Sequence, residues 1–229
     1  MTGIIGAMQI EVDALCARTE NAQIRKISGI DFVFGTLCGR NVVIARSGVG
    51  KVFAAVCAQT MILEFGVRRI INTGVAGALA TGLCTGDIAV ASAVVQHDMD
   101  TTAIGDPAGL ISGLDIVFIP ASPVLTEKIV AAANTLSFKT LVGNIASGDV
   151  FVADRALKEK IRDRFSAIAC EMEGASIGQV CYINNIDFAV IRAISDIADD
   201  GACMTFAEFS GLAAARSSAI IERLLPCLE

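Results

Sequence analysis

Short, uniformly apolar segments that end in acidic residues constrain the fold of this chain more than any other feature. One segment, Ile168–Cys170, is followed at once by Glu171 and Glu173, and a later one ends at Asp196. Strands that are apolar on both sides are typical of a parallel sheet with helices on both faces. Ligands of open α/β sheets bind beyond the carboxyl ends of the strands. The pattern therefore predicts an α/β fold with an acidic site at one edge of the sheet.

The composition fits a fully buried core and limits the classes of function. Hydrophobic residues make up 54% of the 229 residues, and the mean hydropathy is +0.64. No apolar run approaches the roughly 18–20 residues that span a bilayer, so we expect no membrane segment. Glu11 lies too early for a signal peptide, so none is expected either. A net charge of −6 without a long basic run argues against nucleic acid or an anionic membrane as a partner.

Cysteine and histidine usage narrows the chemistry further. Eight cysteines occur without a C-x-x-C pair, and most lie in apolar segments, which predicts reduced core residues of a cytoplasmic protein. His97 is the only histidine, so a metal site with several histidines is impossible. We therefore expect no metal and no cofactor. Catalysis would depend mainly on carboxylates, Arg, Lys, backbone groups and water.

Strand and helix patterns alternate along the chain without a linker or a repeat. They predict one α/β domain over residues 1–229, with a central mixed sheet flanked by helices. We expect a strand over Arg69–Thr73 that is broken by Gly74–Gly77, and a long loop over His97–Ala121. A capping box, Thr205-x-x-Glu208, should open the last helix. Further strands are expected near residues 4–8, 22–28, 31–37, 41–46 and 87–95, and further helices over 9–19 and 52–65 and from Ser122-Pro123.

Two glycine-rich segments follow predicted strands. The first, Ser47-Gly48-Val49-Gly50-Lys51, precedes a helix, so its free N–H groups could bind an anion or a hydroxyl group. It lacks the spacing of a Walker A loop. In the second, Asn72-Thr73-Gly74-Val75-Ala76-Gly77, glycine permits close approach to a ligand. Alone, the first segment is more typical of a plain tight turn, and the second is equally consistent with a turn. We interpret His97-Asp98-x-Asp100 as surface polar residues rather than a cation site.

The acidic residues suggest a reaction at a sugar carbon. Glu11, Glu173 and Asp196 each follow an apolar strand, which unrelated helix caps would rarely do together, so we expect them to converge. Cleavage at a glycosidic carbon needs an acid for the leaving group and a base for water, and its transition state is oxocarbenium-like. Burial can keep one carboxyl group protonated near neutral pH. A second carboxylate can accept both hydroxyl protons of a ribose diol.

Six motifs distributed along nearly the whole chain resemble those of 5′-methylthioadenosine/S-adenosylhomocysteine nucleosidases. The resemblance implies the nucleoside phosphorylase fold, irreversible hydrolysis of an adenine nucleoside to adenine and a thioribose, and a homodimer. The motifs are Gly3-Ile4-Ile5-Gly6-Ala7-Met8 with Glu11, Ser47-Gly48-Val49-Gly50-Lys51, Asn72-Thr73-Gly74, Ser147-Gly148-Asp149, Glu171-Met172-Glu173 and Arg192-Ala193-Ile194-Ser195-Asp196.

The resemblance also implies a role for each site residue. Asp196 would protonate adenine at N7, and Glu11 would activate the attacking water with help from Arg192. Glu173 and the Met172 backbone would hold the ribose hydroxyls. The other implied substrate contacts are Phe151 stacking on adenine, the Val152 backbone at the adenine edge, Met8, Val49, Phe206 and Phe209 on the 5′ side, and Glu171, Val75, Ala76, Gly77, Ser195 and Ile104.

Two positions depart from the usual family pattern. Val75 stands where the family often has Ser, which removes a hydroxyl contact near the water. Ile104 stands where the family often presents an aromatic residue to the pocket of the neighbouring subunit. These departures bear on water positioning and on the preferred 5′ substituent.

Two alternatives remain open at this point. A purine nucleoside phosphorylase would share the fold and the Glu-Met-Glu signature, but Asn72 stands where related phosphorylases place an arginine for phosphate. A non-catalytic nucleoside-binding protein on the same fold should lack the acid or the base, yet both Glu11 and Asp196 are present.

Overall fold

A computed structural model describes residues 1–196 and 206–228; of residues 196 and 206–210 only the backbone is described. The chain mixes strands and helices, as expected. In chain order they are β1 (Thr2–Gly6), α1 (Gln9–Ala17), β2 (Glu20–Ile27), β3 (Ile30–Leu37), β4 (Arg40–Arg46), α2 (Lys51–Phe65), β5 (Arg69–Ala78), β6 (Ile88–Gln96), the 3₁₀ turn η1 (Thr102–Ile104), β7 (Ile119–Pro120), α3 (Pro123–Thr135), β8 (Thr140–Ser147), α4 (Arg155–Phe165), β9 (Ala167–Glu171), α5 (Gly174–Ile183), β10 (Asp187–Asp196), α6 (Phe206–Leu224) and η2 (Leu225–Cys227).

The strands form one mixed sheet, which confirms the predicted fold class. Strand β1 pairs in parallel with β4 and β5, and β5 pairs in parallel with β10. Strand β8 pairs in parallel with β6 and β9, whereas β2–β3–β4, β10–β6 and β9–β5 are antiparallel. The pairings β5–β10–β6–β8–β9 return to β5, so this half of the sheet closes on itself. The closure brings the carboxyl ends of β5, β9 and β10 together.

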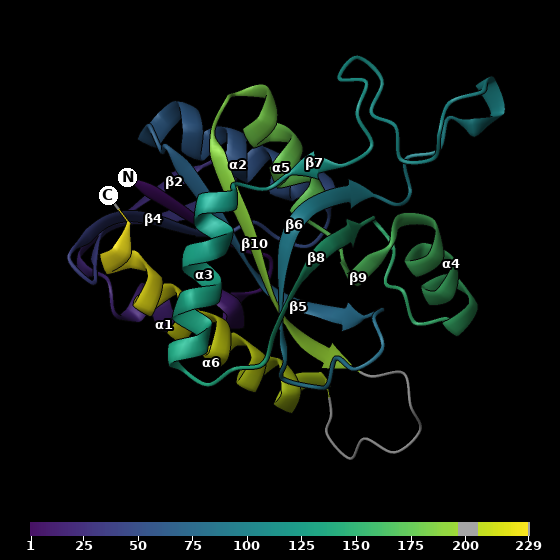
Figure 1. Cartoon of the computed structure of the whole chain (residues 1–229). Helices are drawn as coiled ribbons and strands as arrows, with labels where there is room; N and C mark the ends of the chain where they lie inside the picture. Colours follow the sequence, from purple (N-terminus) through teal and green to yellow (C-terminus); the bar gives the residue numbers. More distant parts are fainter. Residues whose placement is uncertain (197–205, 229) are drawn as a thin grey trace.

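Helices cover both faces of the sheet (Figure 1). One core cluster contains residues of α2 and α5, such as Met61 and Ile177, packed on strand residues such as Ile5. The opposite cluster contains residues of α1, α3 and α6, and Ile129 and Ile221 belong to it. Because both faces are buried, the strands can be apolar throughout.

One predicted break in the sheet is wrong. Strand β5 does not end at Thr73 but continues through the glycine-rich segment to Ala78. Residues Gly74–Ala76 stay in register with β10, and Gly77 and Ala78 then pair with β9. Pairing on both sides overrides the local turn signal of the glycines. Helix α3 begins at Pro123 as expected, although the Ser122 side chain makes no capping bond, and Thr205 of the predicted capping box lies outside the described residues.

The segment between β6 and β7 is the least regular part of the described chain. It projects from the body of the molecule and carries η1 at its tip (Figure 1). Ile104, the last residue of η1, is 80% exposed. None of the helices in the described ranges is long and apolar enough to cross a membrane.

Candidate active site

The carboxyl ends of several strands meet at one cavity, as the sequence pattern predicts. The cavity has a volume of about 290 Å³. Its walls come from the segments after β1, β4, β8 and β9 and from the last residues of strands β5 and β10. The lining residues are Ala7, Met8, Glu11, Val49, Val75, Ala76, Gly77, Val150, Phe151, Val152, Cys170, Glu171, Met172, Glu173 and Ser195.

Glu11 lies in the first turn of α1 and is 3% exposed. Its Oε2 accepts hydrogen bonds from the backbone N–H groups of Ala7 (2.7 Å) and Met8 (2.8 Å), and its Oε1 accepts one from Val75 (3.2 Å). Burial nevertheless raises the pKa of Glu11, against the opposing effects of Arg192 and these three N–H groups. A fixed carboxylate with a raised pKa has the properties of a general base near neutral pH.

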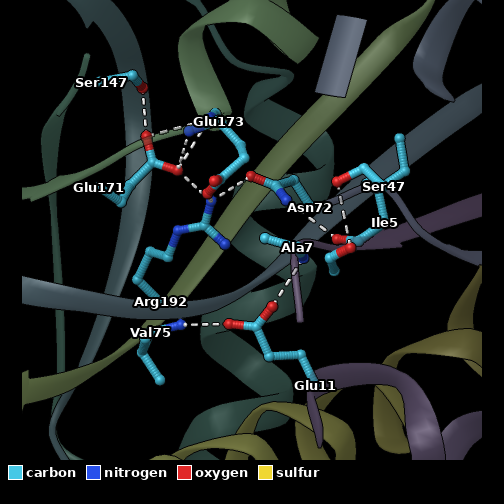
Figure 2. Close-up of polar contacts among 12 residues, drawn as sticks. Ile5, Ala7, Glu11, Ser47, Asn72, Val75, Ser147, Glu171, Glu173 and Arg192 are labelled. Carbon is cyan, nitrogen blue, oxygen red and sulfur yellow. Dashed lines mark hydrogen bonds and ion pairs between the residues drawn. The ribbon is translucent and has the colours of Figure 1, made fainter. Parts of the chain in front are cut away.

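Arg192 is the buried cation at the centre of the site (Figure 2). Its Nη2 donates to Asn72 Oδ1 (2.5 Å) and to Glu171 Oε2, and lies 3.7 Å from Glu173 Oε2. The neighbouring carboxylates raise its pKa although burial opposes them. Asn72 is itself fixed, because its Nδ2 donates to the Ile5 carbonyl (3.0 Å). The guanidinium is therefore held in one orientation.

Gly74 brings Arg192 and Glu11 to the same space. A Cβ atom at this position would lie 2.6 Å from Glu11 Oε1 and 2.7 Å from Arg192 Nη1. No side chain fits between the backbone of β5 and these two groups. The glycine that falsely suggested a turn is thus required by the close approach of two charged groups.

Glu171 is saturated with donors from the protein. Its Oε1 accepts from the Ser147 hydroxyl and from Gly174 N–H (3.0 Å), and its Oε2 accepts from Gly174 N–H (2.8 Å), Glu173 N–H (3.1 Å) and Arg192. Burial alone would raise the pKa of Glu171, but Arg192, Ser147 and Gly174 hold that pKa below its ordinary value. Glu171 is thus an ionised partner of Arg192.

Glu173 has a different environment at the start of α5. Its Oε1 accepts the Gly50 N–H (2.9 Å) across 123 residues of sequence. Burial and the nearby Glu171 charge raise the pKa of Glu173 to about 7, although Arg192 and Gly50 oppose the shift. The first glycine-rich segment thus donates a free N–H, that of Gly50, to a carboxylate of the protein itself.

The segment after β8 supplies the remaining wall of the cavity. Phe151 lines the cavity and yet is 68% exposed, whereas the neighbouring Val152 is buried. An exposed aromatic ring at a cavity mouth suits stacking on a flat heterocycle. Met8 and Val49 add further apolar surface to the cavity.

Four residues implied by the resemblance do not contribute a described side chain to this cavity. Asp196 pairs through its backbone with Gly77, which places its Cα at the cavity edge, but its side chain is not described. The side chains of Phe206 and Phe209, in α6, are not described either. Ile104, in η1, is exposed and is not among the described residues that line the cavity.

Sequence reasoning assigned no role to several residues of the site. Ala7, Val150 and Cys170 line the cavity, and Ser147 supports Glu171. Asn72 was considered only as a replacement for a phosphate-binding arginine, whereas it orients Arg192. Polar residues within or at the end of apolar strands were the available signal for Asn72 and Ser147. The described side chains contain no group of three or more His, Cys, Asp or Glu residues that could hold a metal ion.

Comparisons with known proteins agree with this geometry. A family model described as the phosphorylase superfamily matches residues 2–226. A 5′-methylthioadenosine/S-adenosylhomocysteine nucleosidase of Shewanella sediminis is 39% identical over 224 residues, which are 97% of each chain. The nucleosidase of Neisseria meningitidis, solved with methylthio-immucillin-A, is 36% identical with a TM-score of 0.94 over 99% of each chain.

A structure of Helicobacter pylori futalosine hydrolase is also similar, with 35% identity and a TM-score of 0.92 over 99% of this chain and 97% of that one. The fold, the family match and the near full-length relatives agree with one another. The chain belongs to the phosphorylase superfamily and, within it, to the family of 5′-methylthioadenosine/S-adenosylhomocysteine nucleosidases.

Proposed function

We propose that this protein hydrolyses the N-glycosidic bond of 5′-methylthioadenosine and S-adenosylhomocysteine, releasing adenine and the thioribose. The observation that carries the proposal is that two buried carboxylates, Glu11 and Glu173, line one cavity, with the buried Arg192 next to them. An oxocarbenium-like transition state is stabilised by nearby negative charge, and water attack requires a base. Both needs are met by groups already fixed by backbone N–H donors.

The roles follow the positions of the groups. Glu11 removes a proton from the attacking water, and Arg192 orients that water from the neighbouring position. Glu173, with the Met172 backbone, holds the ribose hydroxyls, while Phe151 stacks on adenine and the Val152 backbone reads its edge. Asp196 protonates N7, because adenine leaves poorly as an anion. Val75 contributes its N–H to Glu11, which supports this base without the hydroxyl group that the family often has there.

Phosphate is disfavoured as the nucleophile. Asn72 stands at the position of a phosphate-binding arginine. Its side chain already donates to the Ile5 carbonyl and accepts from Arg192. Three acidic side chains, Glu11, Glu171 and Glu173, line the cavity, and Arg192 is already paired with Glu171. A phosphate dianion would be repelled by these carboxylates at such short range. Hydrolysis is therefore favoured over phosphorolysis. A purely binding role is not favoured over either reaction.

The test is adenine release from purified protein with methylthioadenosine, after exhaustive chelation and with phosphate absent or in excess. We expect equal rates in both conditions and free methylthioribose as the product. A ribose 1-phosphate product, or a requirement for phosphate, would contradict the proposal. Adenosine, S-adenosylhomocysteine and a futalosine-type nucleoside in the same assay define the 5′ preference. The apolar Met8 and Val49 favour methylthioadenosine over adenosine by about 10- to 10³-fold, because a buried 5′-hydroxyl stays unpaired.

We further propose a cytoplasmic homodimer in which the projecting segment closes the cavity of the partner subunit. Large apolar side chains are exposed on α2, including Val52 (74%), Phe53 (58%) and Leu63 (71%), and Ile104 is exposed on the projecting segment. Contiguous exposed apolar surface marks interfaces. Every cysteine in the described part of the chain is a free thiol, which suits a reducing compartment. Sedimentation at low concentration tests the assembly, and a fully active monomer would contradict it.

A further inference from the structure

Asp98 joins two turns that are far apart in the sequence. Its Oδ1 accepts a hydrogen bond from Lys51 Nζ (2.7 Å), and its Oδ2 accepts one from the Asp149 N–H (2.9 Å). A third hydrogen bond links the two turns directly, because the Lys51 N–H donates to Asp149 Oδ1 (2.8 Å). We call Lys51, Asp98 and Asp149 the clamp. It closes a ring between the start of α2 and the segment that follows β8.

Each turn held by the clamp continues into a wall of the cavity. Gly50, directly before Lys51, donates its N–H to Glu173. Val150, Phe151 and Val152 follow Asp149 directly and line the cavity. None of the three clamp residues is among the described residues that line the cavity, so the clamp acts on a bound ligand only through other residues.

The clamp is itself anchored to the sheet and to α5. Lys51 Nζ also donates to Gln96 Oε1 (3.0 Å), and Gln96 Nε2 donates to Gln179 Oε1 (2.6 Å). The side chains of Lys51 and Asp98 are only 19% and 23% exposed, so their ion pair is partly shielded from solvent. At Gly148, a Cβ atom would fall 2.4 Å from His97 Nε2, so this turn packs tightly on the residue before Asp98. The His97-Asp98 motif thus has a defined place in the structure.

We propose that Asp98 is a positioning residue that holds the Gly50 turn and the Val150–Val152 wall in the geometry that binds the nucleoside. Through the first turn it fixes the carboxylate of Glu173 against the ribose hydroxyls, and through the second it fixes Phe151 against the base. This inference rests on the proposed function, because it assigns the ribose to Glu173. Small displacements of groups that orient a substrate are costly for binding and catalysis.

Asp98→Asn tests the proposal, because an NH2 group replaces one of the two oxygens that accept hydrogen bonds from Lys51 and from the Asp149 N–H. We expect the KM for methylthioadenosine to rise about 10-fold, with kcat falling less than about 3-fold, since a binding contact is loosened. The preference of the enzyme for methylthioadenosine over its 3′-deoxy analogue should shrink about 10-fold, because Glu173 no longer holds the diol firmly. Lys51→Met, at the other corner of the clamp, should change both quantities in the same direction.

Glu159→Gln is the matched control, because it removes an exposed ion pair with Arg155 on α4, away from the cavity. It should leave KM and the 3′-deoxy preference unchanged. Unchanged KM and unchanged preference in both clamp variants would overturn the proposal, as would a fall in kcat alone. Calorimetric titration with a non-cleavable, carbon-linked methylthioadenosine analogue separates the clamp proposal from the proposed hydrolytic function. Binding that weakens about 10-fold in the variants supports the clamp even if the parent hydrolyses no nucleoside.

Discussion

The two halves of the acidic cluster have opposite electrostatic environments although Glu171 and Glu173 are only two residues apart. The half around Glu171 is compensated, with an arginine, a hydroxyl and two backbone N–H groups on one carboxylate. The half formed by Glu173 and Glu11 accepts hydrogen bonds, among the described residues, from backbone N–H groups alone, and Arg192 lies 3.7 Å from Glu173, beyond hydrogen-bond distance. The pKa of Glu171 is lowered, whereas those of Glu173 and Glu11 are raised. We infer that the compensated half, Glu171, has a structural role. The uncompensated half, Glu173 and Glu11, is available to act on a substrate.

The largest effect is expected on turnover when the uncompensated half loses its base. Glu11→Gln keeps the size of the side chain but removes the proton acceptor, so kcat should fall about 10²- to 10⁴-fold. Adenine release measures the loss, and circular dichroism shows that the protein remains folded. Turnover within a few-fold of the parent would show that Glu11 is not the base.

The compensated half should instead control stability. Glu171→Ala leaves Arg192 as a buried charge without its main partner, and breaking one side of a buried pair costs about 3–5 kcal/mol. Urea denaturation at neutral pH measures this loss in the free energy of unfolding. A cost below about 1 kcal/mol, the range of a surface pair, would mean that Glu171 is not the main partner of Arg192.

Glu173→Gln should raise the free energy of unfolding rather than lower it, by an amount that depends on pH. The pKa of Glu173 in the folded protein, about 7, lies above its unfolded value of 4.5, so the ionised form destabilises the fold as the pH rises through 7. The neutral variant should therefore be more stable than the parent by about 1–3 kcal/mol near pH 8, and by less than about 1 kcal/mol near pH 5, where the parent is largely protonated when folded. A variant equally destabilised at both pH values would contradict this assignment.

The smallest effect is expected from Ser147→Ala. The hydroxyl donates to Glu171 and accepts the Ala175 N–H (2.7 Å), so its loss leaves one buried N–H without a partner. We expect a loss of about 1–2 kcal/mol in unfolding free energy. Ser176→Ala is the control, because the Ser176 hydroxyl donates to the Glu173 backbone carbonyl (2.8 Å) and not to the Glu171 carboxylate. If both variants lose the same stability, Ser147 has no special role in supporting Glu171.

The fold and the location of the site could be predicted from local patterns. Apolar runs gave the strands, and the carboxyl ends of parallel strands necessarily share an edge, so Glu11 and Glu173 were expected at one place. The extent of β5 was missed, because a Gly-x-x-Gly segment signals a turn locally while its pairing with β10 depends on residues over 110 positions away.

The division between the two glutamates could not be predicted from spacing. The donors to Glu171 include Arg192 and Ser147, which are 21 and 24 residues away in the sequence, and the donor to Glu173 is 123 residues away. Neighbouring positions in the sequence reveal nothing about which carboxylate receives which partner. The clamp could not be predicted from the sequence for the same reason, because Lys51, Asp98 and Asp149 come from three separate segments.

The most direct test of the division is NMR of the side-chain carboxyl carbons as the pH is varied. Comparison with Glu173→Gln and Glu171→Gln assigns the two resonances. We expect the Glu173 resonance to shift with a midpoint of about 7, and the Glu171 resonance to remain that of an ionised carboxylate throughout the same range. Two carboxyl groups that both titrate below about pH 5, as unperturbed glutamates do, or a Glu171 resonance that titrates near neutrality, would contradict the account.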